Sequence, residues 1–191
     1  MAKLTLVTGG SRSGKSSHAL ELAEAFGPRR LFVATCPNVD GEMAERVGRH
    51  KEERQGRGWT TVECQTELGS LFPEYVRDFD VVLLDCVTLW VNNILYNRDL
   101  SGAVVDDRII AQLCREWLDK TERYPGKVIC VTNEVGLGIV PDNPLARKYR
   151  DLVGTCNQII GRKASEVILV SCGIPLYLKT PLSEQKMGFA K

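Results

Sequence analysis

A glycine-rich segment near the start of this sequence carries its clearest chemical signal. The residues Gly9-x-x-x-x-Gly14-Lys15-Ser16 directly follow the apolar run KLTLVT and directly precede a helical pattern. In that context backbone amides and a helix N-terminus can surround phosphates, the lysine can bridge terminal phosphate oxygens, and the serine hydroxyl can bind Mg²⁺. The alternative is a tight strand-to-helix turn without a ligand. The full pattern favours a loop that binds a nucleoside triphosphate with Mg²⁺.

Polar residues also stand at the ends of other apolar runs. Asp85 closes FDVVLLD, where a phosphate-loop protein needs a second Mg²⁺ ligand, direct or through water. A strand-ending aspartate can instead cap a helix, and it is the phosphate loop that favours the metal interpretation. The carboxyl ends of parallel strands line the ligand crevice of an open sheet, so we expect further side chains beside the loop: Thr35, Glu63, Asn133 and Glu134. Each of these alone could equally be a cap or turn residue.

His50 is the candidate nucleophile within the charged segment RVGRHKEERQGRGW. On a helix expected over residues 40–54 it borders the apolar stripe, and four cations surround it: Arg46, Arg49, Lys51 and Arg54. Nearby positive charge disfavours the imidazolium and keeps a nitrogen lone pair available near neutral pH. Such an imidazole can attack phosphorus. A single helix histidine is also commonly a packing residue, so the residue type alone leaves both roles open.

The elements that must position these residues follow an alternating order. Short apolar runs rich in β-branched residues are separated by helical patterns, and their continuous apolar character predicts strands buried on both faces. This indicates an α/β fold with a mostly parallel central sheet flanked by helices. We expect strands at 3–8, 30–35, 59–64, 79–85, 127–132 and 166–171, and helices at about 15–26, 40–54, 66–78, 86–98, 105–124 and 144–163. The closing segment 181–191 has no clear period and is expected to be a loose tail.

Composition bounds the class of protein. The length suits one domain, predicted over 1–191, and 25 Lys+Arg against 24 Asp+Glu create no global field that would attract nucleic acid or an anionic membrane. The seven cysteines form no CxxC pair and mostly lie in or beside apolar runs, which predicts reduced thiols in a cytoplasmic protein. No apolar stretch approaches the ~20 residues of a membrane span.

Six blocks of the sequence are informative as a set: LVTGGSRSGKSSHALELA, FVATCP, MAERVGRHKEERQGRGWTTVE, VVLLDCVTLWVNN, VTNEVGLGIVPDNPLARKYRDLVGTCNQ and EVILVSCGIPLYLK. Together they resemble the bifunctional adenosylcobinamide kinase/adenosylcobinamide-phosphate guanylyltransferase family of cobalamin synthesis. The blocks occur in family order from about residue 4 to 179, nearly the full chain. RHKEERQGRGW and TNEVGLGIVPDN are far more specific than a phosphate loop.

The resemblance implies a RecA-like P-loop domain, commonly a homotrimer, with two activities. Such an enzyme phosphorylates adenosylcobinamide with ATP or GTP, then transfers GMP from GTP to that phosphate through a guanylyl-histidine and releases pyrophosphate. His50 matches the histidine, and Lys15 is expected to assist catalysis. Nucleotide contacts of the family fall on Gly9, Gly10, Ser11, Arg12, Ser13, Gly14, Lys15, Ser16, Ala34, Thr35, Cys36, Lys51, Glu52, Glu53, Arg54, Glu63 and Asp85, with Ser16 and Asp85 at the Mg²⁺. Serine is expected as often as cysteine at position 36, so the implied role there is a backbone one.

Two rival interpretations use the same phosphate loop. One is a plain small-molecule or nucleotide kinase that transfers only the γ-phosphoryl group, and pyrophosphate release separates it from the bifunctional enzyme. The other is a RecA-like ATPase module that acts on a macromolecule, against which the absence of a basic excess counts. The sequence leaves open the preference for ATP or GTP and the residues of the corrinoid pocket.

Overall fold

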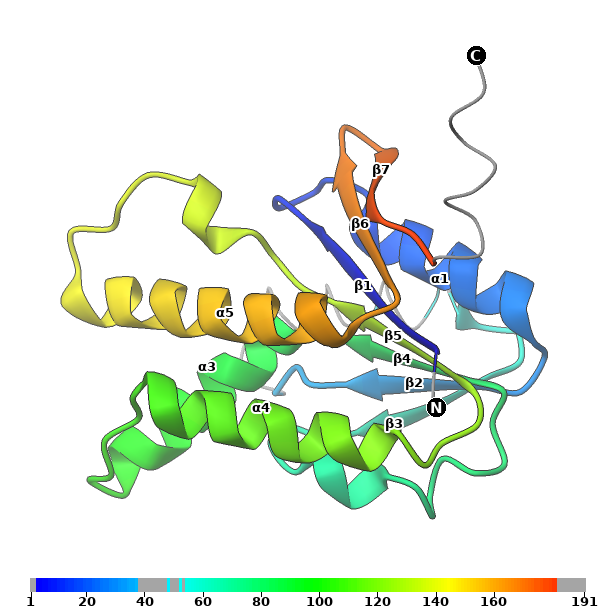
Figure 1. Ribbon diagram of the computed structural model, residues 1–191, viewed down its shortest axis with the longest axis horizontal. Helices are drawn as coiled ribbons and strands as arrows, with labels where there is room; N and C mark the ends of the chain where they lie inside the picture. The colour runs from blue at the N-terminus through cyan, green and yellow to red at the C-terminus, as the bar shows by residue number, and fades with distance from the viewer. Residues whose placement is uncertain (1–2, 38–47, 49–51, 53, 182–191) are drawn as a thin grey trace.

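The computed structural model describes residues 3–37, 48, 52 and 54–181, and its centre is one seven-stranded sheet (Figure 1). The spatial order of the strands is β3-β2-β4-β5-β1-β6-β7. The strands are β1 (Lys3–Gly9), β2 (Arg30–Ala34), β3 (Trp59–Glu63), β4 (Val81–Asp85), β5 (Lys127–Val131), β6 (Glu166–Ser171) and β7 (Ile174–Lys179). All neighbours pair in parallel except β6 and β7, which are antiparallel. The predicted α/β fold with a mostly parallel sheet is confirmed.

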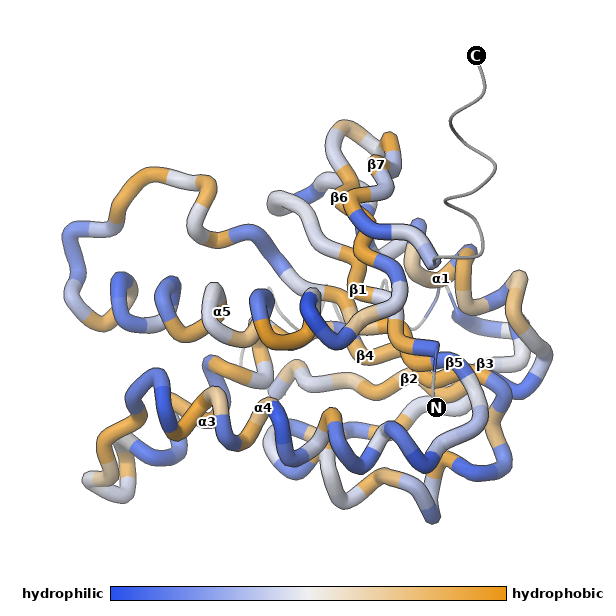
Figure 2. Tube along the Cα trace, in the orientation of Figure 1, coloured by the Kyte–Doolittle hydropathy of each residue, from blue (hydrophilic) through white to orange (hydrophobic). Residues whose placement is uncertain are grey.

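Helices cover both faces of the sheet, as the continuous apolar strands predict (Figure 1). The helix α1 (Lys15–Phe26) packs on one face, where Ala19, Leu20 and Ala23 join Val7 of β1 in a buried cluster. The other face is covered by η1 (Leu68–Leu71), α3 (Val87–Leu100), α4 (Asp107–Thr121) and α5 (Pro144–Lys163). Figure 2 shows the hydrophobic residues concentrated along the strands between these two layers.

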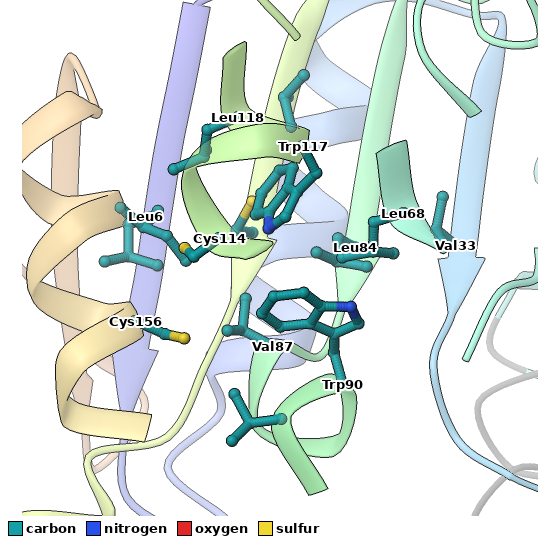
Figure 3. Close-up of a cluster of buried hydrophobic side chains, with 14 of the residues drawn as sticks. Leu6, Val33, Leu68, Leu84, Val87, Trp90, Cys114, Trp117, Leu118 and Cys156 are labelled. Carbon is teal, nitrogen blue, oxygen red and sulfur yellow. The ribbon is translucent and has the colours of Figure 1, made fainter. Parts of the chain in front are cut away.

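Two tryptophans mark the centre of the larger cluster (Figure 3). The rings of Trp90 on α3 and Trp117 on α4 meet edge to face, with centroids 6.4 Å apart and planes at 73°. The thiols of Cys114 and Cys156, on α4 and α5, are fully buried in the same cluster. Since each strand alternates its faces, Leu6 points into this cluster while the adjacent Val7 points toward α1.

The prediction of a helix over 66–78 is wrong. Only the 3-10 helix η1 forms there, followed by turns. The reason is Pro73, which removes a helical donor and forces the preceding residue out of the helical region. Phe72 accordingly has extended backbone, with φ −108° and ψ 141°.

The strand β7 was not expected from the sequence. It returns along β6 after a turn in which Cys172 and Gly173 have φ of 53° and 78°. Two successive positive φ values are typical of a tight hairpin turn. The pair Cys-Gly is not one of the common signals for such a turn, and Pro175 weakens the strand pattern, although an edge strand tolerates proline.

The helix expected over 40–54 falls mostly outside the described residues, and its described members Gly48, Glu52 and Arg54 are helical. The other predicted strands and helices are confirmed, with shifts of a few residues at their ends. Along the described chain, each helix is too short or too polar to cross a bilayer.

Candidate phosphate-transfer site

The loop between β1 and α1 has a backbone that glycine makes possible. Gly9 ends β1, and a Cβ built on it would lie 2.4 Å from the carbonyl oxygen of Val170 on the adjacent β6. Gly14 precedes the first residue of α1 with φ 90°, a left-handed conformation that side chains disfavour. Close packing of the loop against β6 and its hairpin thus requires glycine at both ends.

Two polar groups inside the loop suit a phosphate ligand. Lys15 is only 6% exposed, and its Nζ donates to the Gly10 carbonyl at 3.0 Å, which holds the ammonium within the loop. The Ser13 hydroxyl is buried and, among the described residues, has no hydrogen-bond partner. Buried polar groups normally have partners, so an orphan hydroxyl here fits a site whose acceptor arrives with the ligand. The N-terminus of α1 adds unpaired amides and positive partial charge.

The carboxyl ends of the neighbouring strands form one row beside this loop. In the register of the sheet, Ala34 of β2 pairs with both Glu63 of β3 and Asp85 of β4, and Asp85 pairs with Val131 of β5. The Thr35 amide continues the ladder by donating to the Asp85 carbonyl at 3.3 Å. The strand ends thus meet at one edge of the sheet, where Thr35 and Asp85 are adjacent.

The pKa of the Cys86 thiol reflects the charged groups at this edge. The pKa of Cys86 is raised to about 11, first by burial and then by the Asp85 carboxylate, while a hydrogen bond with Thr88 and the Lys15 ammonium lower it. Asp85 and Lys15 therefore both lie within electrostatic range of one thiol.

Thr35 is held by the protein itself. Its hydroxyl donates to the Cys86 carbonyl and accepts from the Cys86 amide, both at 2.8 Å, and the residue is fully buried. The Asn93 side-chain amide donates to the Thr35 carbonyl at 2.7 Å. The Thr35 hydroxyl thus joins the end of β2 to the backbone that follows β4, and both of these hydrogen bonds are internal to the protein.

A polar network lies beside the loop at the carboxyl end of β5, the strand between β1 and β4. The Thr8 hydroxyl donates to Oε1 of Glu134 at 2.8 Å, and Nδ2 of Asn157 donates to the same oxygen at 3.3 Å. Asn157 accepts from the Thr132 hydroxyl at 2.7 Å and donates to the Asn133 carbonyl at 3.1 Å. The sequence placed Asn133 and Glu134 at this edge, but Thr8 and Asn157 were not predicted as their partners.

Other predicted contacts stand farther from the loop. Arg54 is 5% exposed, with its guanidinium carbon 3.5 Å from the centroid of the Phe32 ring. Glu63 is exposed at the end of β3, four strands away from β1 in the sheet. At the usual strand spacing this is about 19 Å, so the structure does not bring Glu63 together with the loop.

The remaining predicted positions divide into two groups. Gly10, Ser11 and Arg12 are exposed in the loop, Ser16 and Cys36 are half-buried, and Glu52 is exposed. His50, Lys51 and Glu53 lie outside the described residues.

Comparison with known proteins shows which family this chain resembles. The model of the family described as cobinamide kinase/cobinamide phosphate guanyltransferase matches residues 5–178. The bifunctional adenosylcobalamin biosynthesis protein CobU of Salmonella typhimurium is 40% identical over 182 residues, which cover 92% of this chain and 99% of that protein.

Solved structures share the fold at low sequence identity. The flagellar accessory protein FlaH of Methanocaldococcus jannaschii is 15% identical with a TM-score of 0.52, covering 95% of this chain and 80% of that one. An ATPase from the type III secretion system of pathogenic bacteria is 14% identical with a TM-score of 0.52, covering 98% of this chain and 54% of that one. These likenesses identify a RecA-like P-loop fold.

Proposed function

This chain belongs to the cobinamide kinase/cobinamide phosphate guanyltransferase family and is a bifunctional enzyme of cobalamin biosynthesis, and we propose that one phosphate loop serves both of its transfers. The observation that carries the proposal is the loop Gly9–Ser16, with a buried ammonium at Lys15 and a buried, unpartnered hydroxyl at Ser13 in the described structure. Both transfers consume a nucleoside triphosphate, so one cradle can hold the substrate of each.

In the kinase step, the hydroxyl of adenosylcobinamide attacks the γ-phosphorus of ATP or GTP. The loop amides and Lys15 bind the phosphate oxygens and stabilise the charge that develops in the in-line transition state. Mg²⁺, when bound, supplies further positive charge to the phosphates, and Ser16 and Asp85 are the residues that would hold it. Both offer oxygen donors, the type that Mg²⁺ prefers, and the charges of Asp85 and Lys15 both act on the adjacent Cys86 thiol.

In the guanylyl step, we assign the nucleophile to His50. Its imidazole attacks the α-phosphorus of GTP, a phosphorus–nitrogen bond forms, and pyrophosphate leaves. The phosphate made in the kinase step then attacks the same phosphorus and breaks that bond, which yields adenosylcobinamide-GDP. Residue type and family resemblance support this assignment. We propose further nucleotide contacts, through backbone or side chain, at Ala34, Thr35, Cys36, Lys51, Glu52, Glu53, Arg54, Glu63 and the remaining loop residues.

We further propose that the enzyme acts as a homotrimer in the cytoplasm. Exposed apolar side chains on the edge strand β7, including Leu176 and Leu178, support an assembly that covers them. The absence of any CxxC pair among the seven cysteines supports a reducing compartment.

The test is the mass of the intact protein after incubation with GTP and Mg²⁺. We expect a GMP-sized increment in the wild type, because the guanylyl-histidine persists until an acceptor phosphate arrives. The adduct should be labile to acid and stable to alkali, as a phosphorus–nitrogen bond is. It should disappear when adenosylcobinamide phosphate is added.

The two histidines of this chain provide the variant and its control. His50→Ala should lose the adduct and pyrophosphate release but keep phosphorylation of adenosylcobinamide. His18→Ala should keep the adduct, because His18 lies on α1 beside Glu21 and is not part of the proposed chemistry. Normal labelling of His50→Ala would overturn the assignment.

A further inference from the structure

We propose that Glu134 is the general base that accepts the proton of the acceptor hydroxyl in the kinase step. The inference rests on the proposed function in one respect, the placement of γ-phosphoryl transfer at the loop Gly9–Ser16. It assigns a role to a carboxylate that the loop, the metal ligands and the histidine leave unused.

The backbone places Glu134 next to the phosphates. Glu134 follows β5, the strand that lies between β1 with the loop and β4 with Asp85. Its amide donates to the carbonyl of Gly9, the first residue of the loop, at 3.2 Å. The carboxylate therefore stands at the carboxyl edge of the sheet, between the groups proposed to bind the γ-phosphate and the metal.

The side-chain contacts of Glu134 leave one oxygen for a ligand. Thr8 Oγ1, at 2.8 Å, and Asn157 Nδ2, at 3.3 Å, both donate to Oε1. Across the described ranges of the chain, Oε2 accepts no hydrogen bond. Thr8 is 3% exposed whereas Glu134 is half-exposed, so a buried donor helps to orient a carboxylate that remains partly accessible. An oriented carboxylate with one available oxygen is the arrangement that a general base requires.

Only one of the two transfers needs this base. In the kinase step, the acceptor oxygen forms a bond to the γ-phosphorus, the bridging bond breaks with its electrons on the nucleoside diphosphate, and the hydroxyl proton goes to Oε2 of Glu134. In the guanylyl step, the attacking groups are an imidazole lone pair and then a phosphate anion. Neither must lose a proton before it attacks, so Glu134 should matter to the kinase alone.

The chain contains a matched control carboxylate. The Thr5 hydroxyl donates to Oε2 of Glu166 at 2.8 Å, so β1 carries a second threonine–glutamate pair near its opposite end. Glu166 also pairs with Lys127 at 3.5 Å and lies away from the loop. The change Glu166→Gln therefore reports what loss of such a contact does to the fold and, through the fold, to activity.

The experiment measures both activities of the full-length protein. For Glu134→Gln we expect the kcat of cobinamide phosphorylation to fall by at least about 100-fold with the KM for nucleotide within about threefold, the usual contribution of a general base. GMP transfer from GTP to separately prepared cobinamide phosphate should stay within about threefold of the wild type. Glu166→Gln should keep both activities. Added formate should restore part of the kinase activity of Glu134→Ala.

Three results would overturn the assignment. These are a Glu134→Gln variant with normal kinase activity, an equal loss of both activities, which indicates a structural role, and a Glu134→Ala variant that formate does not rescue. Failure of the proposed function would look different, because a folded Lys15→Ala variant would then retain cobinamide phosphorylation near the wild-type level.

Discussion

At the scale of single residues, a change of Lys15 tests whether one nucleotide site or two serve the two reactions. Its ammonium lies inside the loop, bonded to the Gly10 carbonyl at 3.0 Å. We expect Lys15→Ala to lower both phosphorylation and pyrophosphate release by at least about 100-fold, because both transition states place charge on oxygens that this cation neutralises. The two rates, measured on the same preparation, check this.

The stability of that variant should change little, since Lys15 is a member of neither hydrophobic core cluster. A thermal melt accompanies the assay for this reason. Lys163→Ala is the control, because Lys163 pairs with Asp119 and Glu122 at the end of α5, away from the loop. Retention of either activity near the wild-type level in a folded Lys15→Ala variant would mean that the chain has two nucleotide sites.

The same scale shows what sequence can and cannot give for a site. The phosphate loop is contiguous, so its residues are visible as a pattern, and Asp85 is visible because a strand ends there. The partners of Glu134 are not, because Thr8 lies 126 residues and Asn157 23 residues away from it, and only the strand order brings them together. The position of Thr35 at the end of a strand predicted a ligand contact, whereas its hydroxyl forms hydrogen bonds with the Cys86 backbone.

At the scale of elements, α4 offers a test of how the helical layer stabilises the sheet. Leu118 is fully buried on α4, whereas Arg115 is exposed one turn earlier on the same helix. We expect Leu118→Ala to lower the free energy of unfolding by about 2–5 kcal/mol, through lost burial and a residual cavity. Chemical denaturation measures the difference.

Arg115→Ala is the matched change on the exposed face of α4. It should alter the free energy of unfolding by less than about 0.5 kcal/mol, as substitutions of exposed residues usually do. Equal effects of the two substitutions would contradict the packing described for α4.

Predictions of elements succeeded where one signal dominated. The runs that became β1, β2, β4 and β5 are continuously apolar because these strands are buried on both faces, whereas β3 is an exposed edge strand. The helix expected over 66–78 does not form because Pro73, in the middle of that segment, removes a backbone donor and disfavours a helical conformation at Phe72. The strand β7 was missed because its turn, at Cys172 and Gly173, lacks the usual residues and because most of its side chains are exposed.

At the scale of the whole molecule, exposed apolar surface bears on assembly. Ile174, Leu176 and Leu178 on β7 are 69%, 57% and 58% exposed, and Ile139 after η2 (Val135–Leu137) is 96% exposed. A chain with apolar side chains exposed along an edge strand tends to associate. We expect light scattering at micromolar concentration to give about three times the 21.2 kDa of one chain. A monomer with full activity would exclude the trimer.

The packing of the phosphate loop against the β6–β7 hairpin has a consequence for synthesis on the ribosome. Gly9 pairs with Val170, and the Gly173 amide donates to the Ser13 carbonyl at 2.9 Å. The residues that hold the loop in place are translated some 160 positions after the loop itself. A nascent chain that ends before residue 171 therefore carries the complete nucleotide motif without the strand that shapes it. We therefore expect nucleotide to bind this loop only in chains whose synthesis has passed the β6–β7 hairpin.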